Sequence, residues 1–192
     1  VACWRRGGVG GPASHRRCGK GKPSMKLCTG LLVWCLALVL PAAAAAAPPV
    51  PEGPVLLTVS GRITAPNTAD GTARFDRAGL EALGTSTLRT RTPWTEGRPV
   101  FEGVLLRDVL EAVGAAGTSL AATAANAYTV TIPVRDAERY DVLLALRQDG
   151  RRLTLRDRGP LWVVYPRDRH PELRDDVHNG KWIWQLVTLD VR

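Results

Sequence analysis

Cysteine is confined to the first part of this chain. The four cysteines are Cys3, Cys18, Cys28 and Cys35, and residues 47–192 contain none. Exported domains of this size can use disulfides to stabilise a small core. The absence excludes a disulfide framework for residues 47–192, a length that suits one domain able to bury its own core.

Acidic residues are absent from residues 1–46, which carry seven of the 26 basic residues. Without this segment, 19 basic residues face 18 acidic ones, and the formal net charge falls from +8 to about +1. The high isoelectric point therefore belongs mainly to the N-terminal segment. A nearly neutral domain lacks the basic field that nucleic acid binding requires, so we expect no nucleic acid partner.

A signal peptide is predicted over residues 25–46. Met25 and Lys26 open a short apolar run, Pro41 ends it, and alanines follow up to Ala47. A basic head, an apolar middle and a small-residue tail are typical of secretory signals. The alternative is a membrane anchor, but the run is shorter than the roughly 20 residues of a span. We expect a periplasmic or secreted protein that does not span the membrane after cleavage.

These features divide the chain into four predicted segments. Residues 1–24, which precede the only methionine, are interpreted as an upstream extension. The signal peptide covers 25–46, and a proline-rich lead-in covers 47–54. One folded domain is predicted over 55–192.

The patterns of residues 55–192 predict an α+β fold with mixed sheets and few short helices. Strands are expected over 55–63, 85–92, 128–134, 142–146, 153–155, 161–165 and 181–191. Helices are expected over 76–83, with Asp76 as N-cap, and over 104–113. The segments 118–125 and 167–180 are expected to be loops. Pro133 favours an edge strand or a strand end, and Asp149-Gly150 indicates a hairpin turn.

Five motifs in a fixed order suggest a family. They are Phe101 to Leu110 (FEGVLLRDVL), Asn126 to Tyr128 (NAY), Tyr140 to Leu146 (YDVLLAL) followed by Asp149-Gly150, Gly159 to Pro166 (GPLWVVYP), and Lys181-Trp182. This arrangement resembles the oxidoreductase molybdopterin-binding domain family, which has the sulfite oxidase-like fold. The resemblance covers residues 57–191.

The resemblance implies a molybdenum site that this sequence cannot complete. In that family a pterin dithiolene and one cysteine thiolate hold the metal, and the cysteine precedes the Gly-Val-x-Leu motif. Here that segment runs from Thr90 to Trp94 and has no cysteine. A threonine hydroxyl is a hard, weakly acidic donor that does not replace a soft thiolate.

Other positions also depart from the family pattern. Arg158 stands where the family often has histidine, and Trp162 where it often has arginine. Of an Asp-Gly-Tyr motif only Tyr128 remains. Lys181, beside Trp182, matches a position that lies near the pterin in the family.

The predicted cofactor-site or ligand-site residues are Thr90, Arg91, Thr92, Trp94, Tyr128, Arg158, Trp162, Lys181 and Trp182. The tryptophans, together with Trp184, are interpreted either as an aromatic wall or as core packing. The cationic residues, with Arg156, either recognise an anionic group or are solvated surface charges. No catalytic residue is predicted. The spacing of His170 and His178 matches no compact metal-ligand pattern, so no metal site is predicted either.

Three functions remain open. The favoured one is a non-catalytic module that binds or senses a small molecule and reports to a membrane-bound sensor or redox partner. It needs no cofactor, although the resemblance allows molybdopterin. The second is an oxidoreductase whose molybdenum is held without a protein thiolate. The third is a structural or interaction module, favoured by a cleft filled by Trp94, Trp162 and Trp182 and opposed by an open cleft bordered by Lys181 and Arg158.

Overall fold

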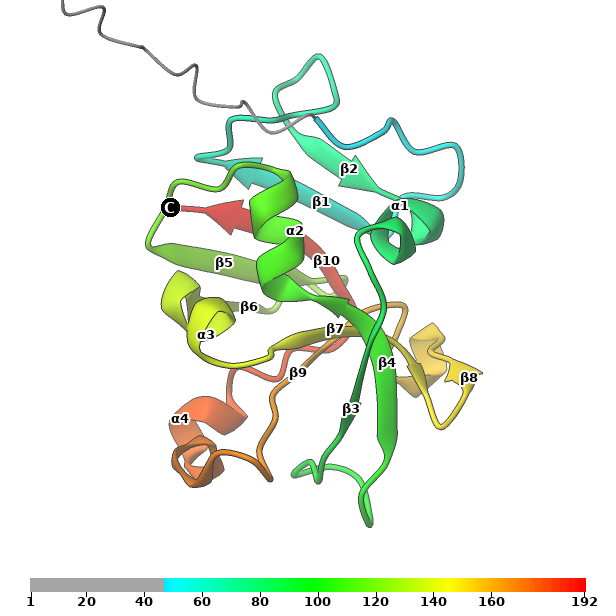
Figure 1. Ribbon diagram of the computed structural model, residues 1–192, viewed down its shortest axis with the longest axis vertical. Helices are drawn as coiled ribbons and strands as arrows, with labels where there is room; N and C mark the ends of the chain where they lie inside the picture. The colour runs from blue at the N-terminus through cyan, green and yellow to red at the C-terminus, as the bar shows by residue number, and fades with distance from the viewer. Residues whose placement is uncertain (1–46) are drawn as a thin grey trace, which may run out of the picture. The chain divides into compact units, whose positions relative to one another are not determined.

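The computed structural model describes residues 47–192 (Figure 1). The predicted upstream extension and signal peptide lie outside the described residues. Residues 47–54 contain no helix or strand. In the described part of the chain, no helix combines the length and apolar character that a membrane crossing needs.

Within residues 47–192 the chain forms ten strands and four α-helices, with two short 3-10 helices. The strands are β1 (Leu57–Gly61), β2 (Ala73–Phe75), β3 (Ser86–Arg89), β4 (Val100–Leu105), β5 (Ser119–Ala124), β6 (Thr129–Pro133), β7 (Leu143–Gln148), β8 (Arg151–Arg152), β9 (Trp162–Val164) and β10 (Leu186–Val191). The helices are α1 (Arg77–Ala82), α2 (Leu106–Ala112), α3 (Val134–Arg139), α4 (Asp176–Asn179), η1 (Leu155–Asp157) and η2 (Pro171–Arg174).

The first sheet is mixed and has the strand order β2-β1-β10-β5-β6. Strand β10 pairs parallel with β1, with Thr58 opposite Thr188, and all other pairs are antiparallel. Figure 1 shows red β10 between β1 and β5. The last strand of the chain therefore lies at the centre of this sheet, next to the first strand.

The second sheet is antiparallel and has the order β3-β4-β7-β8, with β9 also paired to β7. Gly103 in β4 lies against the backbone of Leu144 and Ala145 in β7, where an added Cβ atom would overlap both residues. This close approach explains the glycine at the centre of the FEGVLL motif. Side chains from both sheets form one buried core, which includes Leu57, Phe101 and Leu144. The predicted combination of mixed sheets and few short helices is confirmed.

The predicted loop at 118–125 is wrong. This segment is strand β5, which pairs with both β10 and β6. Four of its six residues are buried, among them Leu120 and Ala122. Alanine-rich sequence carries a weak strand signal, and position in a sheet overrides that propensity.

The helix predicted over 104–113 begins too early. Val104 and Leu105 end strand β4, and helix α2 starts at Leu106. A buried apolar run does not distinguish a strand from a helix by periodicity alone.

The helix at 76–83 was predicted more closely. Asp76 caps α1 by accepting the Gly79 backbone N–H at 2.8 Å, and this bond is the largest cause of its lowered pKa.

The strand predicted over 181–191 is shorter in the structure. Gln185 has a φ of 53°, in the left-handed region, and β10 starts only at Leu186. A bulge between Leu186 and Thr188 breaks the period of two. Because of this bulge, Leu186 is buried together with Leu189 and Val191, which simple alternation did not predict.

The remaining connections differ in detail. The hairpin at Asp149-Gly150 is confirmed, but its return strand ends at Arg152, and Leu155 lies in η1. Helix α3 was not predicted, and the loop predicted over 167–180 contains η2 and α4. The prediction for Pro133 is confirmed, because it ends the edge strand β6.

Candidate functional site

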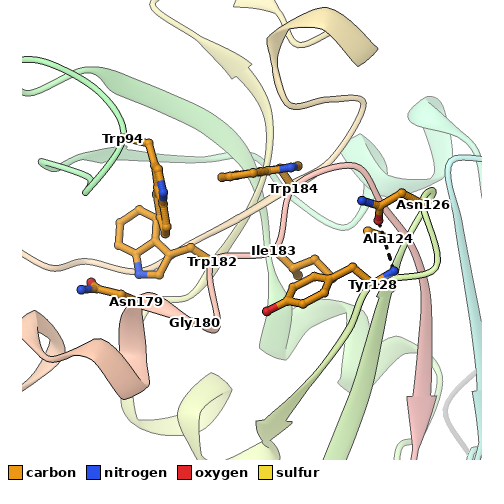
Figure 2. A pocket seen from close by; sticks show the side chains of 9 residues that line it. All are labelled: Trp94, Ala124, Asn126, Tyr128, Asn179, Gly180, Trp182, Ile183 and Trp184. Carbon is orange, nitrogen blue, oxygen red and sulfur yellow. Dashed lines mark hydrogen bonds between the residues drawn. The ribbon is translucent and has the colours of Figure 1, made fainter.

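A pocket of about 330 Å³ collects three of the predicted site residues. Its wall comes from the loop between β3 and β4, the turn between β5 and β6, and the segment between α4 and β10. The lining residues, all drawn in Figure 2, are Trp94, Ala124, Asn126, Tyr128, Asn179, Gly180, Trp182, Ile183 and Trp184.

Three tryptophans dominate one side of this tryptophan pocket. The Trp94 ring meets Trp182 and Trp184 edge-on, with centroid distances of 5.9 Å and 5.5 Å. Trp182 is almost fully buried, whereas Trp94 and Trp184 are half-buried. Figure 2 shows Trp94 and Trp182 beside one another, with Trp184 toward Asn126 and Tyr128. The half-buried rings offer apolar area to a ligand.

Polar groups lie toward the two ends of the lining. Asn126 accepts the Tyr128 backbone N–H at 3.1 Å, and the Tyr128 side chain is exposed (Figure 2). Asn179 lies beside the Trp182 ring. Trp182 Nε1 and Asn179 Oδ1 are buried and have no hydrogen-bond partner within the described residues. These are an unused donor and an unused acceptor on two lining residues.

Trp162 and Arg158 support the pocket from behind and do not line it. Trp162 is fully buried and packs edge-on against Phe101, with centroids 5.3 Å apart. The Arg158 guanidinium carbon lies 5.2 Å from the Trp162 ring centroid and 5.8 Å from that of Trp184. Arg158 also donates to the Trp94 carbonyl oxygen at 3.2 Å. This cation therefore fixes the tryptophan cluster.

In the segment from Thr90 to Trp94, where the family has its metal-binding cysteine, both threonine hydroxyls form hydrogen bonds with other groups of the protein. Thr90 is buried, donates to the Arg91 carbonyl oxygen at 3.3 Å and accepts the Asp168 backbone N–H at 3.2 Å. The Thr92 hydroxyl lies 2.8 Å from the Thr95 hydroxyl. Arg91 is largely exposed and pairs with Asp168. The lining of the tryptophan pocket does not include Thr90, Thr92 or Arg91.

Lys181 lies in a buried ion pair and not at an anion site. Its Nζ donates to Asp136 Oδ2 at 2.7 Å, and Asp136 is 4% exposed. The Tyr165 hydroxyl donates to the same carboxylate oxygen at 3.1 Å. Burial, followed by the Asp136 charge, raises the pKa of Tyr165 well above its usual value. The phenol therefore stays protonated and keeps donating at neutral pH.

The structure thus separates the nine predicted residues into three groups. Trp94, Tyr128 and Trp182 line the pocket, and Arg158 and Trp162 lie behind it. Thr90, Arg91, Thr92 and Lys181 have partners elsewhere. A cleft filled by tryptophans would have favoured a structural module, and an open cleft bordered by Lys181 and Arg158 would have opposed it. The pocket is open but is bordered by neither residue, so it has neither of these two forms.

Several lining residues were absent from the predicted set. Trp184 was considered only as part of an aromatic wall, and Asn126 only as part of a motif. Asn179 and Gly180 come from a segment that was expected to be a polar loop. No spacing rule in the sequence connects them to Tyr128. Within residues 47–192, no group of three or more histidine, cysteine, aspartate or glutamate side chains could hold a metal ion.

Comparison with solved structures shows the fold. The sulfane dehydrogenase SoxCD from Paracoccus pantotrophus matches with a TM-score of 0.50 and 19% sequence identity. The match covers 70% of this chain but only 37% of the SoxCD chain, so this chain spans little more than a third of that structure. At this identity the likeness concerns fold alone. No curated protein matches the chain.

Comparison with family models gives a match to the oxidoreductase molybdopterin-binding domain over residues 77–172. The matched range runs from α1 to η2 and contains half of the chain. It includes Trp94, Asn126 and Tyr128 of the pocket but ends before Asn179. Together with the mixed-sheet fold shared with SoxCD, this match confirms the predicted family. The chain belongs to the oxidoreductase molybdopterin-binding domain family.

Proposed function

We propose that this chain is a non-catalytic binding module that holds a flat small molecule in the tryptophan pocket. The observation that carries the proposal is the pocket itself, with Trp94, Trp182 and Trp184 on one side and Tyr128 on the other. Pockets that combine aromatic walls with a few polar groups are typical of small-molecule sites.

The residues present do not fit a molybdenum cofactor held through a protein thiolate. Residues 47–192 contain no cysteine, and the hydroxyls of Thr90 and Thr92 are engaged with the Asp168 backbone N–H and the Thr95 hydroxyl. The cations near the site are also engaged, Lys181 with Asp136 and Arg158 with the Trp94 carbonyl oxygen. No charged side chain lines the pocket. We therefore assign no redox step to this site.

The chemistry of the lining suggests the class of ligand. Arg158 lies over the Trp184 ring, and its positive charge disfavours a cationic ligand. The unpartnered Trp182 Nε1 and Asn179 Oδ1 match a ligand edge with one acceptor and one donor. Both atoms are buried, so this match requires the half-buried Asn179 side chain to rotate, which would turn its oxygen toward the pocket and uncover Trp182 Nε1. A neutral or weakly anionic heterocycle fits these conditions best.

Ligand binding is tested by quenching of tryptophan fluorescence with a pterin, a purine nucleoside and an indole. At least one probe is expected to bind, and Trp184→Ala to weaken it about 10- to 100-fold, because one ring stacking on an aromatic side chain contributes about 1–3 kcal/mol. Trp184→Phe keeps a ring and serves as the matched variant that retains most of the affinity. Unchanged affinity in Trp184→Ala would rule out this pocket.

The alternative function is a molybdenum-dependent oxidoreductase with no protein thiolate ligand, as family membership allows. Elemental analysis of protein purified from a host that makes the cofactor separates the two functions. We expect molybdenum well below one atom per chain and no pterin fluorescence after denaturation. Stoichiometric molybdenum would replace the binding function with the redox one.

The remaining parts of the proposal concern the setting of the module. We place it in the periplasm or outside the cell, on the basis of the basic, apolar and alanine-rich order of residues 25–46. As a partner we propose a membrane-bound sensor or redox protein, which fits that setting. N-terminal sequencing of periplasmic protein tests export; a start near Ala47 supports it, and a start within residues 1–25 contradicts it.

A further inference from the structure

A second concave site lies on the β7–β8 hairpin and the 3-10 helix η1. It is a groove of about 440 Å³ whose wall includes four arginines, Arg151, Arg152, Arg156 and Arg158. Asp149 and Asp157 are the acidic residues of the wall. We call this site the arginine groove. Its lining shares no residue with the tryptophan pocket.

The arginine groove keeps an excess of positive charge, because its wall has four arginines and two aspartates. Asp149 accepts the Val100 backbone N–H at 2.9 Å, and Asp157 accepts the Thr154 hydroxyl at 2.7 Å. Neither carboxylate pairs with an arginine of the groove, and in the described part of the chain none of the four arginines takes part in an ion pair. Elsewhere on the domain, arginines such as Arg98 and Arg107 are paired with carboxylates.

The strand register leaves one arginine of the groove without a carboxylate opposite it. Arg152 lies opposite Arg147 in the two-residue ladder between β7 and β8, and Arg147 lies opposite Glu102 of β4. Arg147 therefore has a carboxylate in the next strand, whereas Arg152, on the edge strand, has none opposite it.

The hairpin holds these arginines on an ordered backbone. Asp149 and Gly150 both have positive φ angles, 49° and 75°, as a two-residue type I′ hairpin turn requires. Leu153 is buried and donates its backbone N–H to Leu146 at 3.0 Å. The backbone N–H of Gly159 donates to the Thr154 carbonyl oxygen at 2.7 Å, which closes the loop. The groove is therefore built on fixed backbone and not on a free tail.

We propose that the arginine groove binds a multivalent oxyanion, one that carries two or more phosphate or carboxylate groups. Guanidinium groups bind both kinds of oxyanion through paired hydrogen bonds, which a single lysine cannot form. The sequence suggested an anion site that included Lys181 and Arg91, but those residues are paired with Asp136 and Asp168. The other two members of that set, Arg156 and Arg158, line the arginine groove. This inference does not depend on the ligand of the tryptophan pocket.

Isothermal titration calorimetry at low ionic strength tests the site with inorganic pyrophosphate and, separately, citrate. Binding of either probe is expected, and comparison of the two shows whether phosphate or carboxylate is preferred. Arg151→Gln/Arg152→Gln is expected to weaken binding about tenfold or more, because each lost charged hydrogen bond accounts for roughly that factor. Arg156→Gln is a second variant, on an exposed position, in case the double variant does not fold.

Matched variants separate a built site from general surface charge. Arg89→Gln/Arg135→Gln also removes two exposed arginines but lies outside the groove, and it is expected to leave binding almost unchanged. Leu155→Ala removes an exposed apolar residue beside Arg156, again with no expected effect. Tyr128→Ala changes the tryptophan pocket without removing a ring that Arg158 contacts, and it is expected to retain pyrophosphate binding.

Three results would overturn the proposal. They are the absence of binding by both probes, an equal loss in Arg89→Gln/Arg135→Gln, and a loss of binding in Tyr128→Ala. The first result would show that the groove binds no oxyanion. The second would show that binding depends only on net charge, and the third that the probe binds in the tryptophan pocket.

Discussion

Replacing Asp136 with alanine is expected to lower the free energy of unfolding by about 3–5 kcal/mol, because a charge buried without its partner is strongly destabilising. Asp136 is buried on α3 and accepts from Lys181 Nζ at 2.7 Å and from the Tyr165 hydroxyl at 3.1 Å. The Lys181 side chain is only 12% exposed, so water cannot replace the lost carboxylate. Urea unfolding followed by far-UV circular dichroism measures the change.

A surface aspartate provides the control. Asp141 pairs with Arg107 at 2.8 Å and Arg169 at 3.1 Å, but its side chain is 45% exposed. Exposed ion pairs contribute about 1 kcal/mol or less, so Asp141→Ala is expected to change stability little. Equal losses in Asp136→Ala and Asp141→Ala would show that the Asp136 pair is not a buried anchor.

The double variant Asp136→Leu/Lys181→Met tests how the pair acts. Replacing both partners with apolar groups leaves no uncompensated charge, and buried ion pairs replaced in this way often lose no stability. We expect the double variant to be more stable than Asp136→Leu or Lys181→Met alone. A loss equal to the sum of the two single losses would mean that the charges act independently. The pair bears on the proposed ligand site because Lys181 lies between Gly180 and Trp182, which line the pocket.

Trp162→Ala is expected to cost about 3–5 kcal/mol, the usual loss for truncating a buried tryptophan. Trp162 is fully buried and packs against Phe101 and Trp182, with centroid distances of 5.3 Å and 6.3 Å. Its indole Nε1 has no partner among the described residues. Trp162→Phe keeps a ring and removes this unpaired donor, so it is expected to lose less stability and to bind the heterocycle normally. Urea unfolding and fluorescence quenching measure the two effects.

The same experiment decides between the two interpretations of the tryptophans in the sequence. If Trp162 belongs to the core, as its burial indicates, stability falls in Trp162→Ala while Trp162→Phe keeps full affinity. A stable Trp162→Ala variant that no longer binds ligand would instead make Trp162 part of the ligand wall. Trp184 is half-buried, so Trp184→Ala is expected to lose affinity with a smaller loss of stability.

Much of the fold could be predicted from local pattern. Asp76 identifies the start of α1, Asp149-Gly150 marks the hairpin, and the LWVVY segment forms the buried strand β9. The predictions failed where position in the sheet overrides local preference. The alanines of 119–124 form a central strand because β10 and β6 pair on either side of them.

The candidate site was predicted less completely than the fold. Trp94, Tyr128 and Trp182 were grouped because they lie in or next to family motifs, and the structure places all three around one pocket. Lys181 was grouped with them as a neighbour of Trp182, but its side chain points to Asp136. Asn179 carries no signal of its own, because an asparagine in a polar segment is typical of any loop.

The sequence by itself determined that residues 47–192 carry no thiolate, that their net charge is close to zero, and that their motifs belong to one family. Composition and motif order do not depend on how the chain folds. Only the tertiary structure decided that Lys181 pairs with Asp136, 45 positions away, and that four arginines of the β7–β8 hairpin and η1 region line one groove. Contacts between distant positions follow from strand pairing and burial, which local spacing does not encode. The missing thiolate was therefore readable from the sequence, and the tryptophan pocket and the arginine groove were not.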